Sequence, residues 1–248
     1  MSADTDDDLG DVVSNWSPRD HPLSNPQYHV LQGRYCRLEL LNSKTNDNVI
    51  QQLYDVFKPI EKLHFKYTKF GPFKNIDEFK EYVRVKEQPI SNTVLYTIFA
   101  NAIAVGFISY VCITPNQGTI EIGTVSFSQQ LVRTRQATES IFLLMQHAFD
   151  ILGYRRVEWS CNTLNAKSRA AAIRLGFQYE GTWLKADISK GHSRDNAWFS
   201  IIDDEWPYIK QELERWLNPN NFDTNGEQLT KLNGKQVNPR HSKIIEIK

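Results

Sequence analysis

The stretch that decides the fold reads "GTIEIGTVSFSQQLVRTRQATESIFLLMQHAFDILGYRRVEWSC", from Gly118 to Cys161. Its opening run, Gly118–Ser128, is typical of a β-strand, and so is its closing run, Arg155–Cys161. Between them, apolar residues at helical spacing predict a long helix over roughly Thr134–Leu152, which Gly153 ends. A strand, a helix and a second strand in this order predict two parallel strands joined by a crossover helix.

The sequence on either side extends this unit into a mixed α+β fold. Two helices are expected before it, at Asn46–Phe57 and Asn75–Gln88, and a short helix, Asn165–Gly176, is expected after it. A closing helix begins near Pro207. The other β-like runs are Arg34–Leu41, Thr93–Ala100, Ile103–Ile113, Phe177–Trp183 and Arg194–Ile202. We therefore predict a central mixed sheet, mostly antiparallel, with helices on both faces.

The chain divides into three segments by composition. Residues 1–30 are polar and acidic and predict a flexible leader, held in part against the domain by Trp16 and Tyr28. Residues 31–217 predict a single domain. Residues 218–248 are rich in Asn, Gly, Lys and Gln and predict a mostly disordered tail, although the final "KIIEIK" could add a short strand.

The bulk properties narrow the class of protein. The chain has 248 residues, with 29 Lys and Arg against 29 Asp and Glu, and this balance argues against bulk nucleic-acid binding. It has no apolar run of membrane-spanning length, and its acidic start is unlike a targeting peptide. Three widely spaced cysteines predict free thiols, and the histidines form no metal-ligand pattern. We expect a metal-free, cytoplasmic protein, with a nuclear location left open.

Positive charge and small residues gather where the long helix begins, in "VRTRQATES" (Val132–Ser140). The first turn of a helix offers unpaired backbone N–H groups and the positive end of the helix dipole. Arg133 and Arg135 add donors, and Thr134 and Thr138 add hydroxyls, so this turn could hold a pyrophosphate. The alternative is a solvated basic turn in which Thr134 is an ordinary N-cap.

A second stretch, "SCNTLNAKSRAAAIRLGFQYEG" (Ser160–Gly181), places small residues on one face of a helix. Asn165, Ser168 and Ala172 are spaced i, i+3 and i+7. Such a stripe beside a strand could let a narrow ligand arm lie close to the backbone. In the alternative, Asn165 only caps the helix and the alanines only pack.

In their order and spacing, several short motifs resemble the GCN5-related N-acetyltransferase (GNAT) superfamily, and within it the Rim-type branch of ribosomal-protein-alanine acetyltransferases. The resemblance spans about Leu31–Trp206. The motifs are "EIG" (Glu121–Gly123), "ATES" (Ala137–Ser140), "NAKS" (Asn165–Ser168), "RLGF" (Arg174–Phe177), "YEG" (Tyr179–Gly181), "KGHSRDNAWFSI" (Lys190–Ile201) and "EW" (Glu205–Trp206). The resemblance implies a GNAT-like fold, with acetyl-CoA as co-substrate and no metal.

One loop departs from the family pattern. The pyrophosphate loop of the family reads Gln/Arg-x-x-Gly-x-Gly/Ala, whereas this chain has Val132 first, Arg135 at the glycine and Ala137 as the small final residue. Arg135 must point away or toward the phosphates, so coenzyme A would be held more by side chains, or more weakly. The resemblance places coenzyme A against Phe127, Ser128, Leu131, Val132, Arg133, Thr134, Arg135, Gln136, Ala137, Thr138, Asn165 and Ser168.

The resemblance also implies that a neutral amine attacks the thioester carbonyl directly in a ternary complex. Glu121 is the candidate general base; the alternatives are an ordinary half-exposed strand carboxylate there, or a water chain as the base. A backbone N–H at a splayed or bulged end of the fourth strand, around Ser126–Ser128, is expected to stabilise the oxyanion. Many relatives protonate the leaving thiolate with a tyrosine. Its position here is Ala172, and Ser168 is the expected substitute.

The acceptor side is specified less closely. Asp195 is expected to fix its loop through Arg194 or the backbone, and Trp183, Tyr67 and Trp198 either line the acceptor pocket or belong to the core. The acceptor is expected to be a primary amine, on a protein N-terminus or on a small molecule. The sequence fixes neither the amine nor the oligomeric state, and a homodimer stays open.

These patterns predict an acetyl-CoA-dependent N-acetyltransferase. The rival prediction is a non-catalytic acyl-CoA-binding or regulatory module, which the altered glycine loop suggests. A peptide- or RNA-binding protein that uses "KQVNPRHSK" (Lys235–Lys243) is a third prediction, and the neutral overall charge argues against it.

Overall fold

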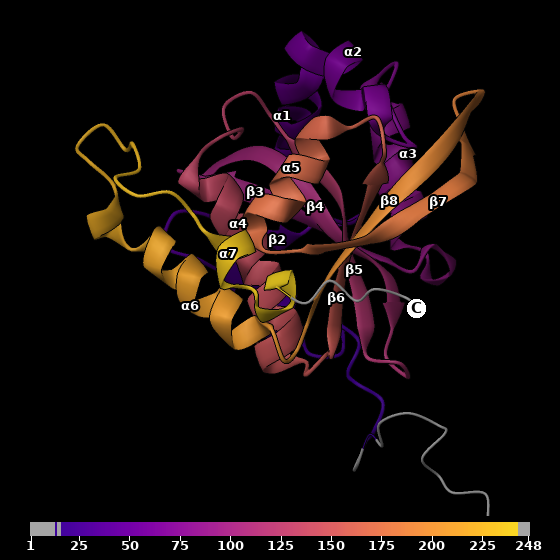
Figure 1. Cartoon of the computed structure of the whole chain (residues 1–248). Helices are drawn as coiled ribbons and strands as arrows, with labels where there is room; N and C mark the ends of the chain where they lie inside the picture. The colour runs from indigo at the N-terminus through magenta and orange to yellow at the C-terminus, as the bar shows by residue number, and fades with distance from the viewer. Residues whose placement is uncertain (1–12, 14–15, 243–248) are drawn as a thin grey trace, which may run out of the picture.

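An eight-stranded sheet forms the centre of the molecule (Figure 1). The computed structural model describes Val13 and residues 16–242, so the start of the leader and the strand expected in "KIIEIK" fall outside it. The strands are β1 (Val30–Gln32), β2 (Arg37–Leu40), β3 (Thr93–Ala100), β4 (Ile103–Thr114), β5 (Thr119–Phe127), β6 (Arg156–Asn162), β7 (Gln178–Ser189) and β8 (His192–Ile202). They lie in the order β1-β2-β3-β4-β5-β6-β8-β7, and only the neighbours β5 and β6 are parallel.

Helices cover both faces of this sheet (Figure 1). They are α1 (Asp47–Phe57), α2 (Glu61–His64), α3 (Ile76–Glu87), α4 (Arg135–Gln146), α5 (Ala166–Leu175), α6 (Trp206–Leu217) and α7 (Gly234–Val237). Helices α1 and α3 share one apolar core with the sheet, and α4, α5 and α6 share a larger one. The mixed α+β fold predicted from the sequence is confirmed. In the described part of the chain, no helix is both long and apolar enough to cross a membrane.

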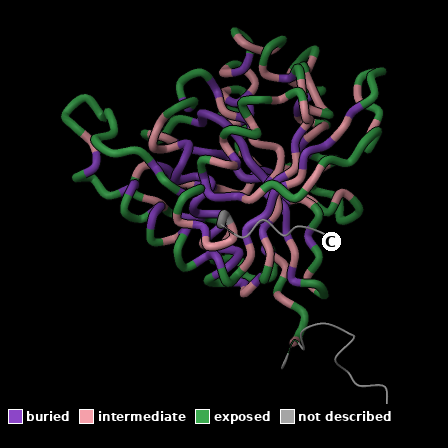
Figure 2. The backbone as a smooth tube through the Cα atoms, in the orientation of Figure 1, coloured by how far each residue is buried: buried purple, intermediate pink, exposed green. Residues whose placement is uncertain are grey.

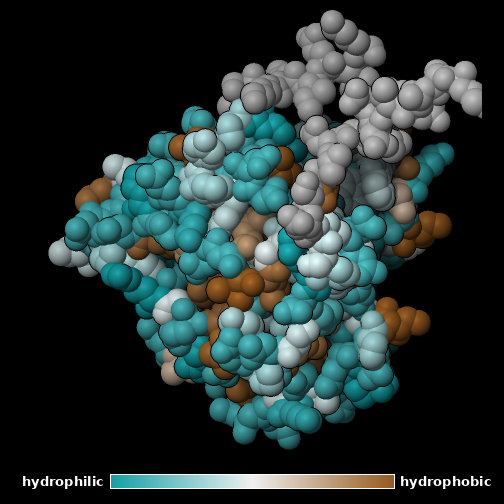
Figure 3. Space-filling view, turned by 90° about the horizontal axis from the view of Figure 1, so that it is seen from below, coloured by the Kyte–Doolittle hydropathy of each residue, from teal (hydrophilic) through white to brown (hydrophobic). Residues whose placement is uncertain are grey.

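The buried backbone lies where the helices meet the sheet, and the loops and outer helix faces are exposed (Figure 2). Figure 3 shows a face of the molecule on which hydrophobic groups form small separate patches among hydrophilic ones. Alternation along the central strands decides which side chains enter which core. Ile120 and Ile122 of β5 belong to the larger core, so Glu121 between them turns to the face of α1 and α3. Trp159 of β6 belongs to the larger core as well, so Ser160 turns the other way.

The long crossover helix forms where the sequence predicted it. Helix α4 continues without a break as a π-helical turn, His147–Ile151, so the helical stretch ends close to the expected Leu152. Ile141, Leu144 and other members of its apolar stripe are buried against the sheet. This helix joins β5 to its parallel neighbour β6. The carboxyl ends of both strands therefore lie at the edge of the sheet where α4 begins.

Part of the leader lies on the domain through the two aromatic residues that the sequence singled out. The Trp16 indole Nε1 donates to the carbonyl of Asn116 at 3.0 Å. The Tyr28 ring packs on His147 with the centroids 4.8 Å apart. The short strand β1 follows directly, and the sequence had not indicated it as a strand.

The chain after α6 also packs on the domain, although its composition had predicted a mostly disordered tail. Helix α7 contacts both α5 and α6 (Figure 1, yellow). The polar residues of the segment bond to backbone groups. The Asn221 carboxamide accepts from the N–H of Thr230 at 3.0 Å and donates to the carbonyl of Trp216 at 3.0 Å. Asn238 donates to the carbonyl of Gly176 at 2.9 Å.

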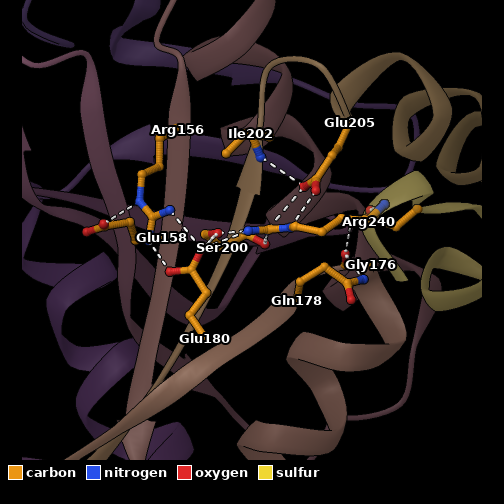
Figure 4. A network of polar contacts seen from close by, with 10 residues as sticks. Arg156, Glu158, Gly176, Gln178, Glu180, Ser200, Ile202, Glu205 and Arg240 are labelled. Carbon is orange, nitrogen blue, oxygen red and sulfur yellow. Dashed lines mark hydrogen bonds and ion pairs between the residues drawn. The ribbon is translucent and has the colours of Figure 1, made fainter. Parts of the chain in front are cut away.

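An ion-pair network fastens the end of this segment to the sheet (Figure 4). Arg240 pairs with Glu205 (Nε–Oε1 2.6 Å) and with Glu180 (Nη1–Oε1 2.8 Å). Burial alone would raise the pKa of Glu180, but hydrogen bonds from Arg156 and Ser200 outweigh it and lower the pKa to about 2. The Glu205 side chain is only 2% exposed, so Arg240 compensates a buried charge.

Replacing Arg240 with alanine should therefore lower the free energy of unfolding by about 3–5 kcal/mol, because it leaves Glu205 buried without its cation. Urea unfolding followed by circular dichroism measures this. Arg84→Ala is the matched control, since Arg84 pairs with Glu81 on the surface and both side chains are more than half exposed. That change should lower the free energy of unfolding far less, because an exposed ion pair stabilises little. Equal losses in the two variants would contradict the role given to Arg240.

Candidate active site

A gap opens between the two parallel strands at the centre of the sheet. Strands β5 and β6 pair only from Thr119 opposite Arg156 to Glu121 opposite Glu158. Both strands continue further, β5 to Phe127 and β6 to Asn162. Beyond Glu121 the two strands do not pair in the described part of the chain. The facing N–H of Ser160 is taken by the Glu121 carboxylate, which leaves the backbone groups nearer the strand ends for a third chain-like molecule.

A bulge redirects β5 along this gap. Its pairing with β4 shifts between Phe107 and Ser109, where Thr124 adopts a left-handed φ of 52°. The sequence predicts a bulge around Ser126–Ser128. The observed bulge lies just before these residues. Ser128 N–H donates to the carbonyl of Val105 at 3.2 Å. N–H groups alternate in direction along a strand, so the N–H of Phe127 is directed to the gap.

The loop that leads to α4 is closed by local hydrogen bonds. Thr134 Oγ1 accepts from the N–H of Ala137 at 3.2 Å and donates to the carbonyl of Leu131 at 2.7 Å, so Thr134 is an N-cap. Leu131 is buried, and its side chain belongs to the core. Arg133 holds a left-handed φ of 66°. Among the residues that the structure describes, the N–H groups of Arg135 and Gln136 in this first turn have no hydrogen-bond acceptor, as is usual at a helix start.

Arg135 and Arg174 lie beside this turn and rest on aromatic rings, Arg174 on Trp216 at 4.8 Å from the ring centroid. The Arg135 guanidinium lies over Tyr35, 4.3 Å from the ring centroid, and over Phe222 at 5.2 Å. These rings account for an arginine at the position where the family has glycine. Arg174 donates to Thr138 Oγ1 at 3.2 Å, which occupies the Thr138 hydroxyl.

The start of α5 brings Asn165 and Ser168 together. Asn165 is the N-cap, and its carboxamide oxygen accepts from the N–H of Ser168 at 3.2 Å. Ser168 Oγ accepts from the indole Nε1–H of Trp159 at 3.0 Å. Helix α5 contains no tyrosine, and Ala172, at the position expected for the family's tyrosine, is fully buried.

Glu121 is a buried carboxyl group, not a half-exposed one. Its residue is 6% exposed. Its Oε1 accepts from the N–H of Ser160 at 3.1 Å and from the hydroxyl of Ser160 at 2.6 Å. Burial raises its pKa above the ordinary carboxyl value, although the Ser160 hydrogen bonds oppose this. A carboxyl with a raised pKa beside a gap can accept a proton near neutral pH.

The two candidate catalytic residues lie on opposite faces of the sheet. Glu121 binds Ser160, whereas Ser168 binds Trp159, and these are consecutive residues of β6. Consecutive residues of a strand point to opposite faces. Glu121 is therefore on the face of α1 and α3, and Ser168 is on the face of α4 and α5. A group placed in the gap would meet a base from one side and a hydroxyl donor from the other.

The β7–β8 hairpin is tied to the loop that follows α2, on the Glu121 face. The ties are Arg194 Nη1 to the carbonyl of Tyr67 (2.6 Å), Lys190 Nζ to the carbonyl of Phe65 (2.5 Å) and Lys69 Nζ to Asp187 Oδ2 (2.7 Å). Asp195 accepts from the N–H of Lys185 at 2.6 Å, which is the structural role predicted for it. Trp183 and Trp198 pack with centroids 4.6 Å apart, and Trp183 is 60% exposed.

A separate hollow of about 310 Å³ lies beside the loop that joins β5 to α4. It is lined by Asp55, Val56, Pro59, Ile60, Gln129 and Gln130. It sits between the end of α1 and the residues just after β5. It therefore adjoins the expected coenzyme site and is a second candidate site for a ligand.

The sequence did not indicate a supporting role at the site for several residues that shape it. Trp159, Tyr35, Arg174 and Phe222 each hold a residue that the sequence had selected. For Trp159 a signal existed, because strand alternation places it on the side of the following helix. Tyr35 and Phe222 lie far from Arg135 in the chain, and no local pattern connects them.

A model of the "Acetyltransferase (GNAT) domain" family matches residues 50–178, about half of the chain. The chain belongs to the GNAT acetyltransferase family. The crystal structure of a GCN5-related N-acetyltransferase from Brucella melitensis is 35% identical, with a TM-score of 0.80 over 88% of this chain and 96% of that one. A GNAT-family structure from Chromobacterium violaceum ATCC 12472 is 36% identical, with a TM-score of 0.72 over 80% of this chain and 96% of that one.

The Rim-type branch has weaker support than the GNAT family. RimL, a ribosomal L7/L12 alpha-N-protein acetyltransferase, is 18% identical, with a TM-score of 0.60 over 70% of this chain and 93% of that one. At this identity the likeness shows the fold alone, so the branch stays a prediction. A search of curated proteins found no match. GNAT acetyltransferases take their acetyl group from acetyl-CoA, and this makes acetyl-CoA the expected donor here.

Proposed function

We propose that this GNAT protein is an acetyl-CoA-dependent N-acetyltransferase that acts on a primary amine, either a protein N-terminus or a small amine. The observation that supports it most is the placement of Glu121 and Ser168 on opposite sides of the gap between β5 and β6. Transfer to nitrogen needs a base where the amine enters and a donor where the thiolate leaves. This arrangement meets both needs.

The donor would bind across the end of the sheet. Its diphosphate would rest on the first turn of α4, where the N–H groups of Arg135 and Gln136 and the helix dipole favour an anion. Arg133 and Thr134 flank this turn. Its pantetheine arm would follow β5 into the gap and pass Asn165 and Ser168 at the start of α5. The remaining residues expected to contact it are Phe127, Ser128, Leu131, Val132, Ala137 and Thr138.

The chemistry then follows from the residues around the gap. The amine nitrogen attacks the acetyl carbon, and Glu121 accepts the proton that the amine gives up. The N–H of Phe127, which faces the gap, would stabilise the oxyanion that forms there. The carbon–sulfur bond breaks, the electron pair leaves on sulfur, and Ser168 donates a proton to that thiolate. An α-amine loses its proton more readily than a lysine side chain and needs less help from the base.

Thiol release over a panel of amines tests this proposal. The purified chain is incubated with acetyl-CoA and, in turn, peptide N-termini, lysine-containing peptides and small diamines. Free coenzyme A is followed with a thiol reagent, and intact mass identifies the acetylated amine. Amine-dependent release with a matching acetyl product is expected. Tight binding of acetyl-CoA with no release over the whole panel would contradict the proposal.

One observation favours the rival, a non-catalytic acyl-CoA-binding module. The loop before α4 has no glycine, and its Thr134 already serves as an N-cap. A donor site built on side chains is compatible with binding alone. Thermal unfolding with added acetyl-CoA, read beside the thiol assay, separates the two functions. Stabilisation without turnover would favour the module.

A further inference from the structure

A buried tryptophan fixes the hydroxyl group of Ser168. Trp159 is 3% exposed, and its indole Nε1–H donates to Ser168 Oγ at 3.0 Å. The indole is held on β6 and packs against Phe177, with ring centroids 5.7 Å apart. The backbone N–H of Ser168 is fixed as well, by the Asn165 carboxamide. The Ser168 hydroxyl therefore has a defined position before any ligand arrives.

The direction of this hydrogen bond determines what Ser168 can do. An indole N–H can only donate, whereas a hydroxyl carries one proton and two acceptor sites. Because Ser168 Oγ accepts from Trp159, its own proton must point elsewhere. The hydroxyl therefore keeps one proton that it can donate to a sulfur atom placed in the gap.

We propose that Trp159 is a positioning residue for the departure of the thiolate, an inference that rests on the proposed acetyl transfer. When the carbon–sulfur bond breaks, sulfur takes the electron pair and the Ser168 proton moves toward it. Negative charge then builds on Ser168 Oγ. The Trp159 N–H, already aligned with that oxygen, stabilises the charge, and hydrogen bonds to charged groups are stronger than those to neutral ones. Solvent returns the proton to Ser168 after the product leaves.

Trp159→Phe tests the inference, because it keeps a buried ring and removes only the N–H and part of the indole. We expect kcat to fall about 10- to 100-fold with the KM for acetyl-CoA unchanged. The same change made in a Ser168→Ala background should cause no further loss of kcat, because the oxygen atom to which the Trp159 N–H donates is absent there. A role in packing alone would lower kcat equally in both backgrounds.

Trp206→Phe is the matched control. Trp206 is 5% exposed, and its Nε1–H donates to Asp150 Oδ1 at 2.6 Å, beside the far end of α4 from the gap. Both variants are assayed at a temperature at which circular dichroism shows them folded. We expect Trp206→Phe to keep its kcat while losing a comparable amount of thermal stability.

Three results would overturn the inference. One is a Trp159→Phe variant with the kcat of the parent chain, and another is an equal loss in the parent and Ser168→Ala backgrounds. The third is an equal fall of kcat in the Trp206→Phe control. Absence of thiol release by the parent chain is a different outcome, because it would contradict the proposed function itself. The parent assay therefore distinguishes the two failures.

Discussion

Replacing Glu121 with glutamine is expected to lower kcat by about 10²- to 10⁴-fold, the range that a positioned general base contributes. Glutamine has almost the same shape and can still accept from Ser160, so the local structure should persist. The loss would come from the missing proton acceptor. Steady-state thiol release with a saturating amine measures it. Unfolding of the variant in urea shows whether the fold is intact.

The pH dependence gives this prediction a second readout. Burial raises the pKa of Glu121, so the base becomes protonated, and the rate falls, at a higher pH than for an ordinary carboxyl. The acid-side limb of the kcat profile should be displaced upward, and the Glu121→Gln variant should lack that limb. A residual limb in the variant would assign it to the amine or to a water chain.

Glu158→Gln is the matched control for this carboxylate. Glu158 on β6 lies opposite Glu121 on β5 in the strand register. Its carboxylate accepts a hydrogen bond from Arg156 Nε at 2.7 Å. Its charge raises the pKa of Glu121, so its removal should shift the acid-side limb to lower pH and keep the plateau. A plateau that falls as far as in Glu121→Gln would contradict the assignment of the base to Glu121.

Replacing Ser168 with alanine is expected to lower kcat by about 10²-fold or more, because the thiolate would then leave without its donor. The KM for acetyl-CoA should change little. Ser140→Ala is the control, since Ser140 is a buried serine of α4 whose hydroxyl only donates to the carbonyl of Ala137 at 2.9 Å. A double variant with Asn165→Ala should be slower still and less stable by about 1 kcal/mol, the cost of an N-cap. Unchanged turnover in the double variant would remove Ser168 from the mechanism.

The fold could be predicted because each element follows a local rule. The strand, long helix and strand of Gly118–Cys161 carry their periodicity in adjacent residues, and the parallel pair follows from their order. Asn75, Thr134 and Asn165 cap helices as their residue types predict. Strand β1 has only three residues, and so short a run carries no periodic signal.

The candidate site could be predicted only in part. Sequence patterns and family resemblance selected Glu121 and Ser168, but the burial of Glu121 depends on strands β4 and β6, which lie on either side of it. The position of the β5 bulge also depends on pairing with β4, which no local pattern of β5 reveals. The predicted bulge at Ser126–Ser128 therefore lies slightly after the observed one. The segment after α6 has a composition typical of disorder, yet Asn221 and Arg240 make specific bonds in it. Composition averages over residues and does not register such bonds.

Hydrogen–deuterium exchange with and without acetyl-CoA tests the central claim most directly, namely that the donor lies across the gap with its diphosphate at the start of α4. We predict slower exchange in three segments on addition of acetyl-CoA: Thr124–Phe127, Arg133–Ala137 and Asn165–Ser168. Exchange that is unchanged in these segments, or protection confined to the hollow between α1 and Gln129–Gln130, would contradict the account.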